Sequence, residues 1–209
     1  GVEQWNQTFG GVEFDLGNSV KQTTDGGYII TGRTVSFGAG DKDVYLVKTD
    51  ASGAEQWYQT FGGSAFDLGT CVHQTSDGGY IIVGGTNSSG SGDRDAYLIK
   101  TDSNGTQQWN ETFGGATFEV ANAVQLTSDG GYIVLGGTDS FGNGNRDVFL
   151  IKTSGNGNTT SIFNMPTPNL NRKLEKVVDM LGRETNPHPN LLFIEIYNDG
   201  TVEKKMVVE

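Results

Sequence analysis

The chain has 209 residues, with 32 glycines, four prolines, one cysteine and a formal net charge of −11 at pH 7. This acidic balance argues against binding to a nucleic-acid backbone. No apolar run approaches the roughly 20 residues that a membrane span needs. A single cysteine excludes an internal disulfide framework and any zinc site built from several cysteines. We therefore expect no nucleic-acid partner and no membrane span.

Glycine and charge divide the chain into two regions. Residues 1–156 hold 29 of the 32 glycines and 8 basic against 18 acidic residues, whereas residues 157–209 hold all four prolines and 6 basic against 7 acidic residues. The polar run Ser154–Thr160 at the junction has the character of a linker. Because the chain opens on Gly1 without an initiator Met or a signal peptide, we expect a processed form or a fragment.

The first region is a repeat of 52 residues, with units 1–52, 53–104 and 105–156. Each unit contains one tryptophan at the same position, and the text around it recurs as EQWNQTFGG, EQWYQTFGG and QQWNETFGG. Aligning the first unit with the second without gaps gives 34 identities. A repeat this close identifies three copies of one structural unit.

Each unit predicts four short strands and no helix. The first set of strands is expected, in chain order, at 19–23, 28–34, 44–49 and 55–61, so its fourth strand lies at the start of the second repeat. Asp-Gly-Gly, a glycine-rich loop and Asp-Ala-Ser-Gly separate them, and each of these is a turn or loop signal. Four strands in 52 residues are typical of one blade of a β-propeller, with a β-sandwich as the alternative. The fold class predicted is therefore all-β, with three propeller-type blades followed by a small C-terminal β domain in residues 157–209.

The phase of the repeat suggests how the blades could be completed. The chain begins on a fourth strand, Glu3–Phe9, while the third unit has no Trp or TFGG after residue 157. We therefore predict that this fourth position is vacant and that the N-terminal strand fills it, since propellers remove their sheet edges by closure. Three blades are fewer than the usual minimum of about four. The chain is then a piece of a longer array, a homodimer of three plus three blades, or an open array whose edge the tail covers.

The repeat motifs resemble known propellers. The run YLVKTDASGAEQWYQTFGG resembles the blade motif of quinoprotein-like propellers. The sequence Asp25-Gly26-Gly27-Tyr28 and its two copies resemble more closely the DGGY-repeat propellers of secreted microbial surface proteins, over residues 1–152. In these families the motifs are structural, so the resemblance implies a fold and an extracellular or cell-surface location, but no activity.

The tail predicts a hairpin, with strands at 193–197 and 202–208 around Asp199-Gly200. It resembles the C-terminal sorting domain of type IX secretion substrates in Gram-negative bacteria, which implies export and anchoring through secretion machinery or a cell-surface partner. A shorter length and an approximate Pro-Asn-Pro opening at 166–169 depart from that pattern, so a β-cap over the last blade is the alternative. The matching positions are Asp179, Leu181, Gly182, Arg183, Glu184, Tyr197, Gly200, Lys204 and Lys205.

Two sets of residues are candidates for binding. Trp5, Trp57 and Trp109 either stack on a sugar ring or pack between blades as core, and their shared repeat position favours the core. Oxygen-bearing loops that could hold Ca²⁺ recur at 40–43, 92–95 and 144–147. Ca²⁺ needs six or more oxygens, so the alternative is that these side chains bond backbone amides at the strand starts. The candidate ligands are Asp41, Asp43, Asp93, Asp95, Asn145 and Asp147.

No catalytic constellation is present, and we expect no other cofactor. No Ser or Cys has a convincing base partner, and the three units differ mainly by conservative exchange. The sequence therefore predicts a secreted or surface propeller that binds or scaffolds and is not an enzyme. The alternatives are a carbohydrate-binding propeller that uses its tryptophans and a non-catalytic fragment of a quinoprotein-type enzyme.

Overall fold

A computed structural model describes residues 1–157, 159–161, 173–179, 183–186, 192–198 and 202–206. These residues form strands, turns and loops, and none of them lies in a helix, let alone one suited to crossing a membrane. The chain divides into two compact units, Gly1–Met165 and Pro166–Glu209. The division therefore falls after the polar run that the sequence suggested as the boundary.

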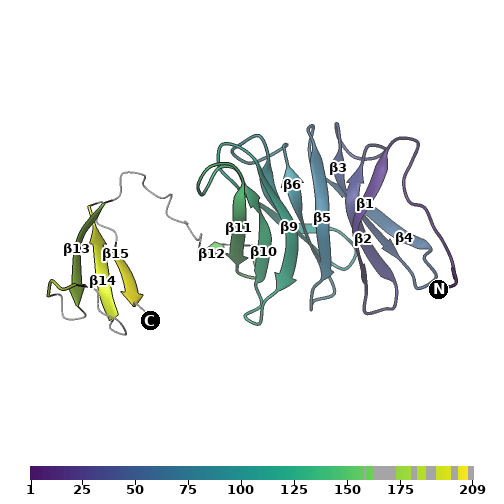
Figure 1. Cartoon of the computed structure of the whole chain (residues 1–209). Coiled ribbons are helices and arrows are strands. Elements are labelled where there is room, and N and C mark those ends of the chain that lie inside the picture. Colours follow the sequence, from purple (N-terminus) through teal and green to yellow (C-terminus); the bar gives the residue numbers. More distant parts are fainter. Residues whose placement is uncertain (158, 162–172, 180–182, 187–191, 199–201, 207–209) are drawn as a thin grey trace. The chain divides into compact units, whose positions relative to one another are not determined.

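The compact unit Gly1–Met165 contains three four-stranded antiparallel sheets that recur at the spacing of the repeat, with the strands in chain order (Figure 1). The all-β class and the four strands per repeat are confirmed. The first sheet contains β1 (Asp15–Gln22), β2 (Tyr28–Thr34), β3 (Asp43–Thr49) and β4 (Glu55–Phe61). The second contains β5 (Asp67–Gln74), β6 (Tyr80–Thr86), β7 (Asp95–Thr101) and β8 (Gln107–Phe113). The third contains β9 (Glu119–Leu126), β10 (Tyr132–Thr138), β11 (Asp147–Thr153) and the short β12 (Thr159–Ser161).

The first strand of each sheet begins four residues earlier than its sequence predicts. In β1 the register shifts between Gly17, which pairs with Gly32, and Ser19, which pairs with Thr31. A β-bulge of this kind inserts an extra residue and interrupts the two-residue alternation. The residues after the bulge therefore predict a strand from their sequence, whereas the residues before it do not.

Within a single chain, both ends of the repeat array differ from the sequence prediction. Residues 1–14, including the expected strand Glu3–Phe9, contain no strand. The fourth position of the third sheet is instead occupied by β12, which pairs with β11 at Lys152 and Thr153. The middle sheet lies between the N-terminal segment and β11 within one chain (Figure 1), so the segment does not reach the strand beside which the prediction placed it.

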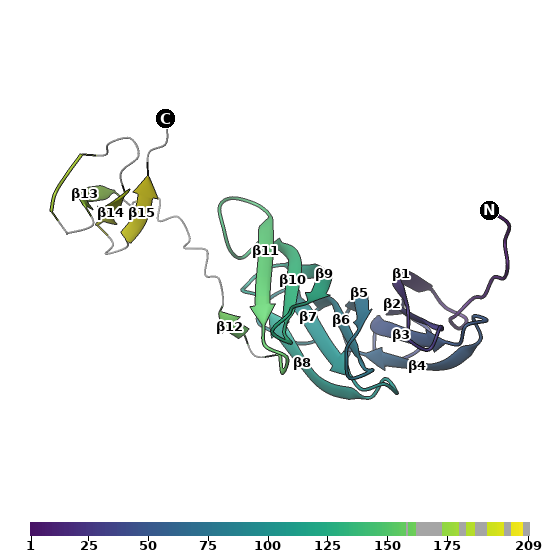
Figure 2. The ribbon, with the colours of Figure 1, turned by 90° about the horizontal axis from the view of Figure 1, so that it is seen from below.

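The core lies between successive sheets, which follow one another as layers (Figure 2). Because side chains alternate along a strand, β6 supplies both cores. Tyr80 and Ile82 face the first sheet, whereas Ile81 and Val83 face the third. Each of these four side chains is almost fully buried, and burial of an aliphatic side chain of this size contributes about 1.5–3 kcal/mol. The middle sheet is thus apolar on both faces.

Glycine is required where the bulged first strand approaches the second. A Cβ on Gly84 of β6 would overlap the carbonyl oxygen of Leu68, and Gly32 stands in the same relation to Leu16. The Asp-Gly-Gly turns need glycine for a different reason, since Gly26 and Gly78 have φ of 85° and 84°. The high glycine content of the repeats therefore has defined structural causes.

The second unit contains a three-stranded antiparallel sheet of β13 (Leu174–Asp179), β14 (Leu192–Tyr197) and β15 (Val202–Met206). The strands β14 and β15 pair directly, as the predicted hairpin requires, from Leu192 opposite Met206 to Ile196 opposite Val202. The turn residues of that hairpin lie outside the described residues.

Candidate functional site

An aromatic contact joins each sheet to the next at the end of the sheets that carries the Asp-Gly-Gly turns. The Trp57 ring on β4 packs on the Tyr80 ring on β6, with 5.9 Å between centroids. The corresponding pair Trp109 and Tyr132 is 6.1 Å apart. Both tryptophans are partly buried and pack against the two cores. These two indoles thus occupy the junctions between sheets.

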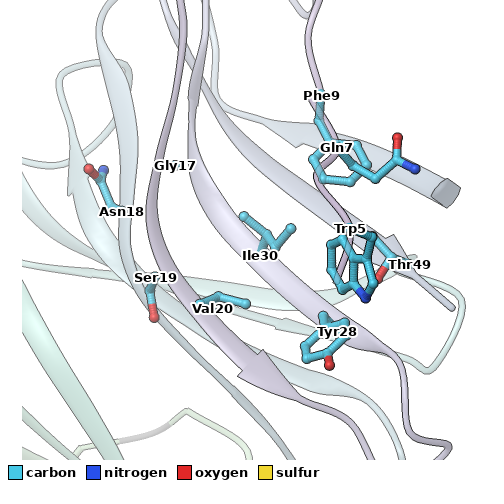
Figure 3. Close-up of a pocket in the computed structure, with 10 residues that line it drawn as sticks. All are labelled: Trp5, Gln7, Phe9, Gly17, Asn18, Ser19, Val20, Tyr28, Ile30 and Thr49. Carbon is cyan, nitrogen blue, oxygen red and sulfur yellow. The ribbon is translucent and has the colours of Figure 1, made fainter. Parts of the chain in front are cut away.

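Trp5 makes the same contact without the rest of a sheet around it. Its ring lies 5.7 Å from that of Tyr28, yet 44% of the residue is exposed. A groove of about 550 Å³ separates the N-terminal segment from the face of the first sheet (Figure 3). Its lining is mainly apolar, with a few amides and hydroxyls, and consists of Trp5, Gln7, Phe9, Gly17, Asn18, Ser19, Val20, Tyr28, Ile30 and Thr49.

A lysine lies beneath each Asp-Gly-Gly turn, and in the first two sheets it is buried. The Lys100 Nζ donates to Asp77 Oδ2 at 2.8 Å, to the Thr101 carbonyl at 2.8 Å and to Gln108 Oε1 at 3.2 Å. An ammonium group has three protons, so this set satisfies it. Burial acts to raise the pKa of Asp77, but hydrogen bonds from Lys100 and Thr75 outweigh it and lower that pKa to about 2.

The third copy of this lysine has a smaller set of partners. Lys152 Nζ bonds both carboxylate oxygens of Asp129 and the Thr153 carbonyl. Within the described part of the chain, no glutamine side chain from a fourth strand accepts a hydrogen bond from Lys152. The Lys152 side chain is 25% exposed, whereas that of Lys100 is 5% exposed. The third sheet therefore lacks the cover that completes the network in the other two.

The residues suggested for Ca²⁺ do not converge. The Asp43 carboxylate accepts the Ala39 amide at 2.8 Å, and Asp95 and Asp147 make the same bond in their own loops. Asp41 and Asp93 are exposed, and Asn145 lines a small hollow beside Arg146. In the described ranges no group of three or more His, Cys, Asp or Glu side chains is placed to share a metal ion. These loops thus follow the capping alternative.

Two of these loop acids, Asp43 and Asp95, each lie close to an acid from the next repeat. Sequence reasoning missed this proximity. Asp43 and Asp67 converge on the same side of Gly62, and Asp95 and Glu119 converge in the same way on Gly114. Burial, followed by the charge of Asp67, raises the pKa of Asp43. The acids at positions 15, 67 and 119 occupy one repeat position, and this recurrence was a usable signal.

A ladder of alternating phenylalanine and arginine side chains runs across all three repeats at the opposite end of the sheets. The Arg94 guanidinium lies 4.3 Å from the Phe66 ring centroid and 4.8 Å from that of Phe118. The Arg146 guanidinium in turn lies 4.4 Å from the Phe118 centroid. Each such cation–π contact contributes about 0.5–2 kcal/mol. In order, the ladder is Phe14, Arg33, Phe66, Arg94, Phe118 and Arg146.

The first arginine of this ladder comes from a different position in the repeat. Arg33 lies on β2 where the later repeats have Gly85 and Gly137, and Lys42 takes the loop position that Arg94 has in the second repeat. A Cβ on Gly85 would meet the Arg94 side chain at 2.9 Å. One guanidinium therefore fits between successive phenylalanine rings. It comes from β2 in the first repeat, as Arg33, and from the loop before the third strand in the later repeats.

In the tail, the residues that match the sorting pattern form a turn closure. Arg183 donates from its backbone amide to Asp179 Oδ1 at 3.0 Å and from Nε to Oδ2 at 2.7 Å. The Tyr197 hydroxyl donates to Glu195 at 2.6 Å. Glu184 forms an isolated bridge with Val178, and on β15 Lys204 and Lys205 pair in register with Ile194 and Phe193. Leu181, Gly182 and Gly200 lie outside the described residues.

Comparison with known proteins gives one weak similarity. No family model matches the chain. The chain is 26% identical over 167 residues to Regulatory protein FlaEY of Caulobacter vibrioides, in an alignment that covers 69% of this chain and 17% of that protein. The chain thus spans about one sixth of the length of the curated relative that it matches.

Proposed function

We infer that the first unit is a propeller-type array whose role is to bind or scaffold. The supporting observation is the way successive sheets pack. The first strand of the middle sheet, β5, packs on β1, β2 and β3 of the first sheet. The first strand of the third sheet, β9, packs in the same way on β5, β6 and β7. The first strands are thereby neighbours, and the strand order runs away from them in each sheet. In a propeller the first strands surround the central channel in this way. An electron-microscopy reconstruction with β1, β5 and β9 away from the axis would contradict this proposal.

The proposed role is not catalytic. The buried charged groups recur from repeat to repeat and bond backbone amides, carbonyls or one another, as Asp95 and Lys100 do. Such groups position turns and strand starts, which supports a rigid platform. The acidic charge belongs mainly to the repeats, and we propose that this surface is displayed outside the cell or on its surface.

The tail is proposed to direct export and anchoring. The observation that supports this is the closure between Asp179 and Arg183, which gives two residues of the sorting pattern a defined partner in each other. In a Gram-negative bacterium with a type IX system, the full chain should become accessible to external protease. A chain without Leu174–Glu209 should remain inside. Normal surface delivery of the shortened chain would exclude this role and favour a capping role.

A second candidate function is carbohydrate binding in the groove at Trp5. An indole that is 44% exposed beside Gln7 and Asn18 combines a stacking surface with amide donors and acceptors. A glycan array should then show signals that Trp5→Ala removes and that the buried-site variant Trp109→Phe retains. An array without signal would exclude this candidate.

A further inference from the structure

The outer faces of the first and third sheets expose the residues that are buried at the two internal junctions. Val20 on β1 is 58% exposed, while its equivalents Val72 and Val124 are buried at 0% and 1%. On the other outer face, Leu150 on β11 is 50% exposed, while its equivalent Leu98 is buried at 1%. Val72 and Val124 belong to the two internal cores. The two outer faces are therefore the two halves of one junction.

We propose that a second copy of this chain covers both faces, with the third sheet of each copy packed on the first sheet of the other. The junction would repeat the one already present twice within the chain, and so it is continuous with an established interface. The groove at Trp5 lies along β1 and would receive the partner's β9, β10 and β11, so dimerisation and sugar binding in that groove exclude each other. The contact between copies does not depend on the proposed function. The number of copies, two, rests on the proposed propeller arrangement.

The phenylalanine–arginine ladder has complementary ends. Its last member in the third repeat is Arg146, which has Phe118 on one side. Its first member is Phe14, which has Arg33 on one side and is 56% exposed. At the internal junctions an arginine of one repeat always meets a phenylalanine of the next, as Arg94 meets Phe118. In the assembly, Arg146 of one copy would meet Phe14 of the other.

Hydrogen bonds from side chains to backbone carbonyls also cross each junction. The Asn18 side-chain amide donates to the Gly69 carbonyl at 2.8 Å, and the Thr70 hydroxyl donates to the Ala121 carbonyl at 2.6 Å. Each bond runs from one repeat to the next. The third member of this series is Asn122, which is exposed on β9. Its counterpart across the proposed junction is the Gly17 carbonyl of the other copy.

The N-terminal segment supplies what the third sheet lacks. In the complete sheets the fourth strand pairs along the third strand, with Trp57 opposite Lys48 and Trp109 opposite Lys100. The same register would place Trp5 of one copy opposite Lys152 of the other. Gln4 would then stand where Gln56 and Gln108 accept from their lysines, and Glu3–Phe9 would become a strand beside β11, displacing or extending β12.

Two copies would supply six sheets, which lies within the usual range of about four to eight blades. A head-to-tail contact of this kind forms a closed ring when its rotation closes and an open filament when it does not. The alternative occupant of the β11 face is the tail of the same chain. That occupant would leave the chain monomeric and would overturn the proposal.

The experiment measures the mass of the full 209-residue chain by size-exclusion chromatography with light scattering, over a dilution series. We expect a dimer. Val20→Glu and Leu150→Lys should each weaken dimerisation at least about 100-fold, because each places an unpaired charge in the junction. Ala51→Glu and Ser103→Lys carry the same charges in exposed turns and should leave the dimer unchanged.

The decisive step is to mix the Val20→Glu and Leu150→Lys variants in equal amounts. One of the two junctions in a mixed dimer has unchanged faces, and the other pairs Glu with Lys, so the dimer mass should return. A monomeric unmodified chain, a dimer that both variants leave intact, a mixture without recovery or a species larger than a dimer would overturn the proposal. Circular dichroism of each separate variant checks that it is folded, and recovery on mixing shows this independently.

Discussion

The ring of Trp57 lies against the ring of Tyr80, with 5.9 Å between centroids, and so connects the last strand of one sheet to the second strand of the next. The two residues are 23 positions apart in the chain, and both recur in every repeat. A Cβ on Gly105 would meet the Trp57 ring at 2.6 Å, so the following turn also closes on the indole. The contact couples folding of one sheet to folding of its neighbour.

We expect Trp57→Ala to lower the free energy of unfolding by about 3 kcal/mol, since it removes a large aromatic side chain that packs on the core. Trp57→Phe retains an aromatic ring at the junction and should cost about half as much. Urea unfolding followed by circular dichroism measures both changes. Equal costs for the two variants would argue against ring packing as the source of the stability.

Gly84→Ala should destabilise the chain by about 3 kcal/mol, because the added methyl group overlaps the Leu68 carbonyl oxygen where the backbones approach each other. Gly78→Asn is the matched control. Gly78 has positive φ, which asparagine tolerates, and a Cβ there meets only an ordinary contact with Ser103 at 3.8 Å. The control should cost about 0.5 kcal/mol in the same assay. A tolerated Gly84→Ala would show that the bulged strand can move away.

Because of the ion pair between Asp77 and Lys100, we expect the free energy of unfolding to depend on pH in the acidic range. The pKa of Asp77 is lowered in the folded chain to about 2, from 3.8. The carboxylate therefore stabilises the fold above about pH 4, and this contribution is lost as the pH falls from about 4 to 2.

Asp77→Asn should cost about 1 kcal/mol at pH 7, a modest value because the Asp77 side chain is more than half exposed. The difference between the original chain and this variant should shrink between about pH 4 and pH 2. Thermal unfolding across that range measures it. A difference that is constant with pH would exclude the ion pair as the cause.

The ladder predicts that an arginine can be moved from the loop to the strand. Arg94→Lys alone should cost about 1 kcal/mol, since it removes a guanidinium stacked between two rings. Gly85→Arg alone should also destabilise, because its side chain would occupy the space of Arg94. The double variant reproduces the arrangement of Arg33 and Lys42 in the first repeat.

A double-mutant cycle in urea should therefore give a favourable coupling of about 1–2 kcal/mol between the two changes. Additive costs would contradict the view that a single guanidinium site exists between the rings.

The sequence predicted the sheets well because the repeat itself located each element three times. Every Asp-Gly-Gly turn, every second and third strand and the position of each fourth strand in the first two repeats could be read from spacing and turn chemistry. The start of β1 could not, because the bulge at Gly17 hides the alternation. β12 could not either, because Thr159–Ser161 carries no aromatic or β-rich signature beyond two threonines.

The candidate site was less accessible from the sequence. Stacking of Arg94 between Phe66 and Phe118 depends on how two sheets face each other. The sequence pattern of one strand does not predict which residues of a neighbouring sheet it will contact. The acids at Asp67 and Glu119 recur visibly, yet their approach to Asp43 and Asp95 follows only from the packing of neighbouring repeats. In both cases the missing information was the contact between units.

The ladder also has a consequence for how such a chain can change in length. Because each repeat begins with a phenylalanine and ends with an arginine that meets the next phenylalanine, duplication or loss of a whole 52-residue unit leaves a matched pair at every new seam. Near-identical DNA segments recombine readily, and the resulting arrays would need no compensating substitution at the seams. The segment that is duplicated and the segment that packs are then the same, so the number of repeats can change among descendants while each junction is preserved.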